Sequence, residues 1–254
     1  MESIILVGYK RAASKKILVI NRKGGAGKST LAISIASLYA HHGMKTEMID
    51  LDPQETSYFW GSKNADVRAQ KYQPSSHIPF SLALRLEADT EITVVDSPSN
   101  FSLFEMEKYV SMVDKIVFPL QPSPIDIHSM LKFVKQLISS KVFSRNNVEL
   151  AFVITRASKS NIGHECVENV LKHMKYPLLG AMTEDNCYQE MFSTQTCFLD
   201  INPEVDDELW QKLTQWVGIE IPNKESDLPD NITDFVKASD KKKQKRRFPF
   251  SLQS

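Results

Sequence analysis

The feature that most constrains the fold of this chain is a glycine-rich segment between an apolar run and the start of a helix. The apolar run is Ile17-Leu18-Val19-Ile20, and residues 31–36 have the composition of a helix. Between them lies the phosphate loop, residues 23–30, which reads Lys23-Gly24-Gly25-Ala26-Gly27-Lys28-Ser29-Thr30. A strand, a glycine loop and a helix start form the context that phosphate binding requires, because glycines let successive backbone N–H groups face one anion. We therefore predict that residues 24–30 bind a nucleotide.

The charged and hydroxyl side chains of the phosphate loop fit the same interpretation. The N-terminus of the following helix adds a partial positive charge. Lys28 would neutralise the β- and γ-phosphates, and the hydroxyl of Ser29 would complete the coordination of Mg²⁺. The alternative is a flexible surface turn before a helix. Such a turn needs neither an apolar strand before it nor Ser-Thr after the lysine.

The loop departs from the general pattern G-x-x-x-x-G-K-S/T in an informative way. Arg22 holds the place of the first glycine, and a second lysine, Lys23, stands at the front. This motif resembles the deviant Walker A sequence of the ParA/MinD family of ATPases. In that family the leading lysine, here Lys23, reaches across a dimer interface to phosphates bound by the other subunit. The resemblance covers about residues 15–218 and implies a homodimer that closes around ATP and Mg²⁺.

A second signature follows the next expected strand, residues 45–49. The sequence Asp50-Leu51-Asp52-Pro53-Gln54 begins where this strand ends, and the carboxyl ends of strands form the ligand-binding edge of α/β sheets. Asp52 would orient the attacking water and, with Asp50, shape the Mg²⁺ site. An Asp-Pro turn with a capping carboxylate is the alternative. By resemblance, Asp52 is tied to hydrolysis. We expect Trp60, shortly after, to be a buried core residue.

A third signature is the apolar run of residues 91–95 that ends in Asp96. This arrangement is that of a Walker B strand, whose carboxylate would hold Mg²⁺ through water, across from Ser29. An aspartate that caps the next helix is the alternative. The ParA/MinD family more often has Asp-x-Pro-Pro here, whereas this chain has Asp96-Ser97-Pro98-Ser99. The difference leaves the shape of the loop open but not the expected role of Asp96.

Two further segments resemble small, plasmid-type ParA proteins. Residues 119–126 match their P-x-x-P-S-P-x-D segment, which lies near the nucleotide and the dimer interface. Arg156, at the end of the expected strand 149–155, would contact the base or ribose, although a surface salt bridge is an alternative for it. By resemblance alone, the loop 182–185 would pass over the adenine. These matches favour the plasmid-type branch over MinD.

Alternating apolar strands and helices predict one doubly wound α/β domain with a mostly parallel sheet. The length of 254 residues suits a single such domain with extensions, and 42% hydrophobic residues suffice for a large core. We expect residues 1–14 to be an arm or edge strand, 15–218 the ATPase domain, and 219–254 a disordered linker with a basic tail. In the last helix, residues 205–216, Leu209, Leu213 and Trp216 share one face, and Trp210 is expected to point elsewhere.

The zero net charge of the chain hides a basic tail. Residues 237–254 hold seven of the 31 Lys and Arg residues but one of the 31 Asp and Glu residues. We expect the tail to contact DNA phosphates without sequence preference. The alternatives are a solvated tail and an anionic membrane surface, although no apolar helical stripe supports a MinD-like membrane helix. The candidate DNA-binding residues are Lys241, Lys242, Lys243, Lys245, Arg246 and Arg247.

The cysteines and the apolar runs indicate a cytosolic protein. Cys166, Cys187 and Cys197 show no zinc or C-x-x-C spacing and are best explained as reduced thiols. No apolar run reaches the roughly 18 residues of a membrane span. The chain also has no cysteine before Cys166, which argues against an electron carrier like nitrogenase reductase, whose cluster needs two cysteines per subunit.

These observations together predict a slow, partner-stimulated ATPase. By resemblance, its ATP-bound dimer would bind DNA non-specifically, associate with the nucleoid in the cytoplasm, and position or segregate a cargo through a ParB-like adaptor. A plasmid is the expected cargo. The first alternative is a MinD-like, membrane-associated regulator of cell division or polarity. A scaffold that binds nucleotide without hydrolysing it is a further alternative, because the sequence after Asp96 is unusual.

Overall fold

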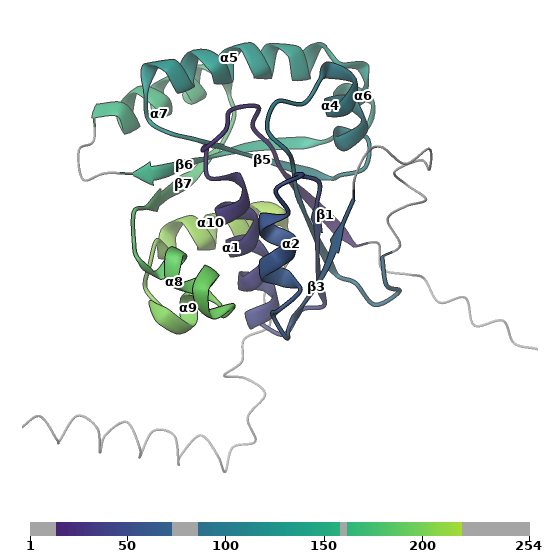
Figure 1. The fold of residues 1–254 in the computed structure, drawn as a ribbon. Helices are drawn as coiled ribbons and strands as arrows, with labels where there is room; N and C mark the ends of the chain where they lie inside the picture. The colour runs from purple at the N-terminus through teal and green to yellow at the C-terminus, as the bar shows by residue number, and fades with distance from the viewer. Residues whose placement is uncertain (1–13, 73–85, 158–161, 220–254) are drawn as a thin grey trace, which may run out of the picture. The chain divides into compact units, whose positions relative to one another are not determined.

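A computed structural model describes residues 14–72, 86–157 and 162–219, and its centre is a parallel β-sheet (Figure 1). The described strands form one seven-stranded sheet in the order β3-β2-β4-β1-β5-β6-β7, and every neighbouring pair is parallel. The strands are β1 (Lys15–Val19), β2 (Thr46–Asp50), β3 (Val67–Lys71), β4 (Ile92–Asp96), β5 (Lys115–Leu120), β6 (Glu149–Ala157) and β7 (Leu178–Thr183). This arrangement confirms the predicted doubly wound α/β fold.

Helices cover both faces of this sheet. On one face lie α4 (Leu103–Val110), α5 (Pro124–Ser139), α6 (Lys141–Arg145) and α7 (Ile162–Met174) (Figure 1). On the other lie α1 (Lys28–His41), α2 (Thr56–Gly61), α8 (Cys187–Thr194), α9 (Phe198–Ile201) and α10 (Asp207–Val217). Because both faces are covered, the central strands β2, β4 and β5 are buried along their whole length, polar residues of β2 included.

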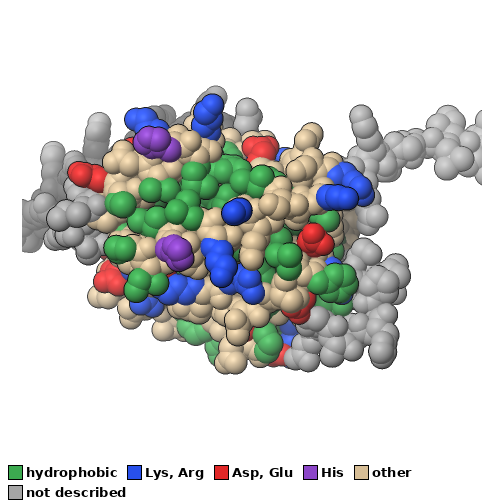
Figure 2. Space-filling view, turned by 90° about the horizontal axis from the view of Figure 1, so that it is seen from above, with side chains coloured by type: hydrophobic (Ala, Val, Ile, Leu, Met, Phe, Trp, Pro, Cys, Tyr) green, Lys and Arg blue, Asp and Glu red, His purple; other side chains and the backbone are tan. Residues whose placement is uncertain are grey.

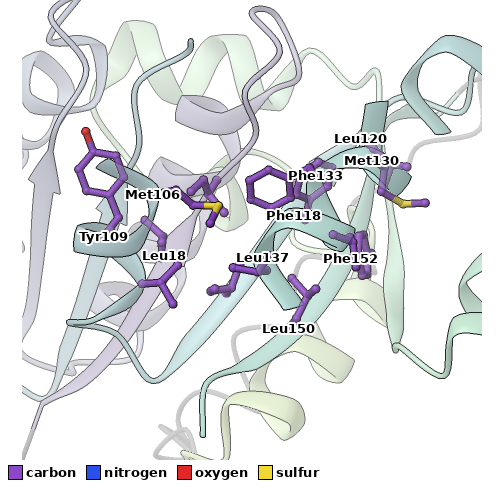
Figure 3. Close-up of a cluster of buried hydrophobic side chains, with 14 of the residues drawn as sticks. Leu18, Met106, Tyr109, Phe118, Leu120, Met130, Phe133, Leu137, Leu150 and Phe152 are labelled. Atoms are coloured by element: carbon purple, nitrogen blue, oxygen red, sulfur yellow. The ribbon is translucent and has the colours of Figure 1, made fainter. Parts of the chain in front are cut away.

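Aromatic side chains fill the layer between the sheet and α5 (Figure 3). The ring of Phe118 on β5 lies 5.0 Å from that of Phe133 on α5 and 5.5 Å from that of Phe152 on β6. All three are at most 3% exposed, so one helix and two strands share a single packed cluster. This packing fixes β5 and the start of α5 relative to β1, and therefore relative to the phosphate loop.

The prediction for Trp60 is confirmed, and Trp210 points away from the face of Leu209, as predicted, but it is buried there. Trp60 is fully buried, and its indole N–H donates to the carbonyl oxygen of Met191 over 3.0 Å. Trp210 is 3% exposed, and its ring lies 4.7 Å from that of Phe198. Helix α10 packs against two neighbours, the sheet and the α8–α9 segment, so side chains on two of its faces are buried. Trp216, placed on that face, is only partly buried.

Two elements, the edge strand β3 and helix α4, were not predicted from the sequence. The edge strand β3 carries polar side chains that bond within the sheet: the Gln70 amide donates to the buried Glu47 carboxylate over 2.9 Å. Only Val67 and Ala69 alternate with polar side chains in this five-residue strand, so its periodic signal is weak. Helix α4 does have a local signal, because it begins with a capping box between Ser102 and Glu105 that can be recognised in the sequence.

Part of the predicted domain organisation lies outside the described residues. This applies to residues 1–13 of the expected arm and to residues 220–254 with the basic tail. Within the part of the chain that the structure describes, no helix combines the length and the apolar composition needed to cross a membrane.

Candidate functional site

The phosphate loop joins the central strand β1 to helix α1 at the carboxyl edge of the sheet. Strand β1 pairs with β4 on one side and β5 on the other, so the loops that follow these three strands meet there. Helix α1 begins at Lys28, three residues earlier than the sequence indicated, and Gly27 precedes it with a φ of 83°. Residues 24–30 therefore have the strand-to-helix geometry that the sequence predicts.

Two glycines of the phosphate loop differ in how closely the fold surrounds them. Gly25 has a φ of +73°, and a Cβ there would meet nothing within 4 Å. Gly27 has a φ of +83°, and a Cβ there would lie 3.1 Å from the methyl carbon of Thr155. The Thr155 hydroxyl also donates to the Ala26 carbonyl oxygen over 3.0 Å, so this side chain supports the loop from β6.

We expect Gly27→Ala to destabilise the protein more than Gly25→Ala when no nucleotide is present. Both variants place a side chain at positive φ, which costs about 1–2 kcal/mol. Only the former also crowds Thr155, and overpacking adds about 1–3 kcal/mol. Urea unfolding of the two variants measures the difference. Equal losses would mean that Thr155 yields without cost.

Lys28 lies inside the site rather than on its surface. Its ammonium group donates to the Lys23 carbonyl oxygen over 3.1 Å and to the Ser99 hydroxyl over 3.0 Å. Burial lowers the pKa of Lys28, and the carboxylates of Asp96 and Asp52 oppose that effect. A buried ammonium group at the start of a helix, with carboxylates near it, is placed to bind an anion together with a metal ion.

Asp96 has the most unusual environment in the described part of the chain. It ends β4, is fully buried, and neither of its carboxylate oxygens has a hydrogen-bond partner among the described residues. Burial, followed by the charge of Asp50, raises the pKa of Asp96 to about 7, and the nearby hydroxyls of Ser29 and Ser57 act in the opposite direction. A buried carboxylate without partners is costly, so its retention suggests a ligand that compensates it.

The donor set around Asp96 fits a magnesium ion. A metal that keeps several waters needs only one or two protein oxygens beside those of a phosphate, and Asp96 with Ser29 supplies them. Among the described residues there is no cluster of three His, Cys, Asp or Glu side chains that would hold a metal by itself. Any Mg²⁺ here would therefore depend on phosphate oxygens for much of its coordination.

The two aspartates of the second signature have different environments. Asp50 is buried and accepts bonds from the backbone N–H groups of Asp52, over 2.8 Å, and of Tyr58, over 2.9 Å. It therefore fixes the turn that leads into α2. Asp52 is partly exposed, and its carboxylate accepts from the backbone N–H of Gln54 over 2.9 Å. Burial raises the pKa of Asp50, and the two backbone N–H groups act in the opposite direction, so its structural role rests on those two hydrogen bonds.

Lys23 is paired within its own subunit. Its ammonium group lies 2.8 and 2.9 Å from the two carboxylate oxygens of Asp126 on α5, while its side chain stays 37% exposed. The Asp126 carboxylate is buried and also bonded to the hydroxyl of Ser123, which caps α5. The proline-rich segment singled out in the sequence thus anchors the leading lysine at the edge of the site.

Arg156 lies in a cavity beside the phosphate loop, as its predicted role requires. The cavity holds about 580 Å³ and is lined by Gly27 and Thr30 on one side and by the loop after β7, Glu184 to Asn186, on the other. Arg156 has a φ of 52°, which turns the chain at the end of β6. The lining is polar and continuous with the phosphate loop, so the cavity has the size and place for the base and ribose of a nucleotide.

Several residues that shape the site were not identified from the sequence, because none of them is a defining residue of a recognisable motif. The buried Asn21 side chain accepts from the Lys23 backbone N–H over 2.9 Å and donates to the Pro119 carbonyl oxygen over 2.7 Å. The Gln121 amide donates to the Gly25 carbonyl oxygen over 3.0 Å. These bonds join loops that are a hundred residues apart in sequence, which no local pattern reveals.

Comparison with known proteins agrees with this geometry. Residues 17–196 match the family model described as the CobQ/CobB/MinD/ParA nucleotide-binding domain. The chain is 24% identical over 162 residues to the maintenance of carboxysome distribution protein A of Gloeobacter kilaueensis, covering 64% of this chain and 72% of that protein. It is 24% identical over 187 residues to protein ParA of Rhizobium radiobacter, covering 69% and 81%. The ATP complex of a variant of Cyanothece McdA has the same fold, with a TM-score of 0.68 and 14% identity over 83% of this chain and 99% of that one.

Proposed function

Because this chain belongs to the CobQ/CobB/MinD/ParA family of nucleotide-binding proteins, we propose that it is an ATPase that positions or partitions a cargo. The observation that carries the proposal is the meeting of Lys28, Ser29 and the fully buried Asp96 at the phosphate loop. A buried cation, a hydroxyl and an orphan carboxylate suit a nucleoside triphosphate with Mg²⁺. Relatives named for carboxysome distribution and for ParA support the cargo role.

In the proposed reaction each side chain has one task. The backbone N–H groups of residues 24–30 and the Lys28 ammonium group would bind the phosphates, and Ser29 and Asp96 would hold Mg²⁺. The metal adds positive charge at the phosphates when bound. Asp52 orients the water that attacks the terminal phosphate. Arg156 and the loop after β7 hold the base and ribose.

We further propose that two subunits close face to face around the nucleotide, with Lys23 acting across the interface. Exposed apolar side chains support such a face: Phe104 on α4 is 66% exposed and Ile125 on α5 is 75% exposed. Both helices begin at the edge of the sheet that bears the phosphate loop. Figure 2, which looks down on the layer of helices that contains α4 and α5, shows hydrophobic side chains gathered on the outer face of this layer, with Lys and Arg around them. Surfaces of this kind mark interaction sites.

A DNA-binding assay with ATP, with ADP and without nucleotide tests the proposed cargo role. We expect salt-sensitive binding to duplex DNA of arbitrary sequence only with ATP and Mg²⁺, and a dimer under the same conditions in sedimentation. A plasmid carried through a ParB-like adaptor that stimulates hydrolysis is the proposed setting. Binding to anionic liposomes instead of DNA would favour the MinD-like alternative. A monomer that ignores nucleotide would refute both.

We expect removal of residues 238–254 to weaken DNA binding and to flatten its salt dependence. The deleted segment holds the six cations from Lys241 to Arg247, which lie outside the described residues. Each phosphate contact that is lost lowers the slope of log affinity against log salt by about 0.9. Titration at several salt concentrations measures that slope, with ATP hydrolysis as the control for an intact site. An unchanged slope would remove the tail from the DNA interface.

A further inference from the structure

Ser99 lies in the site beside Lys28 but has no task in the proposed reaction. It follows Asp96 by three residues, is half-buried, and its hydroxyl accepts from the Lys28 ammonium group over 3.0 Å. The same oxygen lies 4.0 Å from the point where a Cβ on Gly24 would be. Ser99 therefore lies against both the lysine and the first glycine of the phosphate loop, on the side of the Mg²⁺ ligand Asp96.

The hydrogen-bond inventory of this pair leaves two donors available. A lysine ammonium group has three N–H donors, and two of them already go to the Lys23 carbonyl and the Ser99 hydroxyl. A serine hydroxyl that accepts from an ammonium group keeps its own O–H free to donate. The third N–H of Lys28 and the O–H of Ser99 can thus meet on one anionic oxygen, and such charge-assisted bonds are the strong ones.

We propose that Ser99 is a positioning residue that steadies Lys28 and donates its hydroxyl to the terminal phosphate of a nucleoside triphosphate. It thereby favours triphosphate over diphosphate. This inference rests on the proposed nucleotide site. A different role would be to hold Lys28 away from phosphate until a nucleotide arrives. The two roles predict opposite changes in nucleotide affinity when the Ser99 hydroxyl is removed, because loss of a holding contact would strengthen the binding of both nucleotides.

Calorimetric titration of the full chain with a slowly hydrolysed ATP analogue and with ADP, both with Mg²⁺, separates these roles. For Ser99→Ala we expect the analogue to bind about tenfold more weakly, as the loss of a hydrogen bond to a charged group implies, and the affinity for ADP to stay within about twofold. Ser99→Thr keeps a hydroxyl and should preserve the wild-type ratio. Ser102→Ala is the matched control: it removes a hydroxyl three residues along, which caps α4, and should leave the ratio unchanged.

Three results would overturn the proposal: equal losses for both nucleotides in Ser99→Ala, a gain for either, or a threonine variant that behaves like alanine. If thermal unfolding shows that Ser99→Ala does not fold, Ser99→Cys, which also lacks the hydroxyl, takes its place in the comparison with Ser99→Thr. A wild-type chain that binds neither nucleotide would instead refute the proposed function, so the two failures are distinguishable.

Discussion

Replacing Lys23 with alanine or glutamine is expected to abolish ATP hydrolysis while leaving nucleotide binding by the single subunit largely intact. The reason is that Lys28, not Lys23, lies among the phosphate-facing groups of its own loop, whereas Lys23 points to Asp126 at the edge of the site. Loss of one group that stabilises the transition state costs about 10²–10³-fold in rate. Single-turnover hydrolysis and equilibrium nucleotide binding measure the two effects separately, and partner-stimulated turnover should be lost as well.

The control for charge is Arg22→Ala. Arg22 is the neighbouring exposed cation, and its guanidinium group contacts Gln136 over 3.4 Å and the ring of Phe101 instead of the phosphate loop. We expect its removal to change the rate little. Full turnover in the Lys23 variants would refute the trans-lysine mechanism outright.

Mixed dimers test whether Lys23 acts in trans. In a dimer of one Lys23→Ala subunit and one Asp52→Asn subunit, the first subunit keeps its own Asp52 and receives Lys23 from its partner. If the lysine crosses the interface, mixing two inactive variants restores hydrolysis at one site. If it acts within its own subunit, each site lacks one group and the mixture stays inactive. The ion pair with Asp126 means that the lysine has to leave this partner, or share it, when two subunits close.

The sequence predicted those parts of the site that are contiguous in the chain. The phosphate loop and Asp96 each follow an apolar run, Asp50 ends an expected strand, and parallel strands bring such ends to one edge. The loop geometry at Gly27 and the burial of Asp96 are therefore consequences of local patterns. The ParA/MinD resemblance, which rested on the same stretches, is confirmed by the match over residues 17–196.

What the sequence could not reveal are contacts between segments far apart in the chain. The pairing of Lys23 with Asp126 joins residues 103 positions apart, and the bond from Thr155 to Ala26 spans 129. Strand β3 was missed because only Val67 and Ala69 stand between its polar side chains, and the contacts of these polar side chains with Glu47 on β2 leave no local pattern. The partner of Trp210, the ring of Phe198, also could not be read from the sequence, because a helix with two packed faces has no single apolar stripe.

Asp96→Asn is expected to have opposite effects on activity and on stability. Asparagine keeps the shape of the side chain but removes the charge that would hold Mg²⁺ through water. We therefore expect hydrolysis to fall by about 10²–10³-fold, and nucleotide affinity to lose its dependence on Mg²⁺. Hydrolysis assays and calorimetric titrations with Mg²⁺ and with a chelator measure these two changes.

The gain in stability follows from the environment of Asp96 in the protein without ligands. Its carboxylate is fully buried, has no hydrogen-bond partner among the described residues, and feels the charge of Asp50. Burial and Asp50 outweigh the opposing effects of Ser29, Ser57 and Lys28 on this carboxylate. Neutralising it should therefore raise the free energy of unfolding by about 1–3 kcal/mol at mildly alkaline pH with a chelator present. Asp66→Asn, at an exposed turn, is the matched control and should change neither property. An Asp96→Asn variant that is less stable than the wild type would mean that the carboxylate has structural partners, and its assignment to the metal would then lose its physical basis.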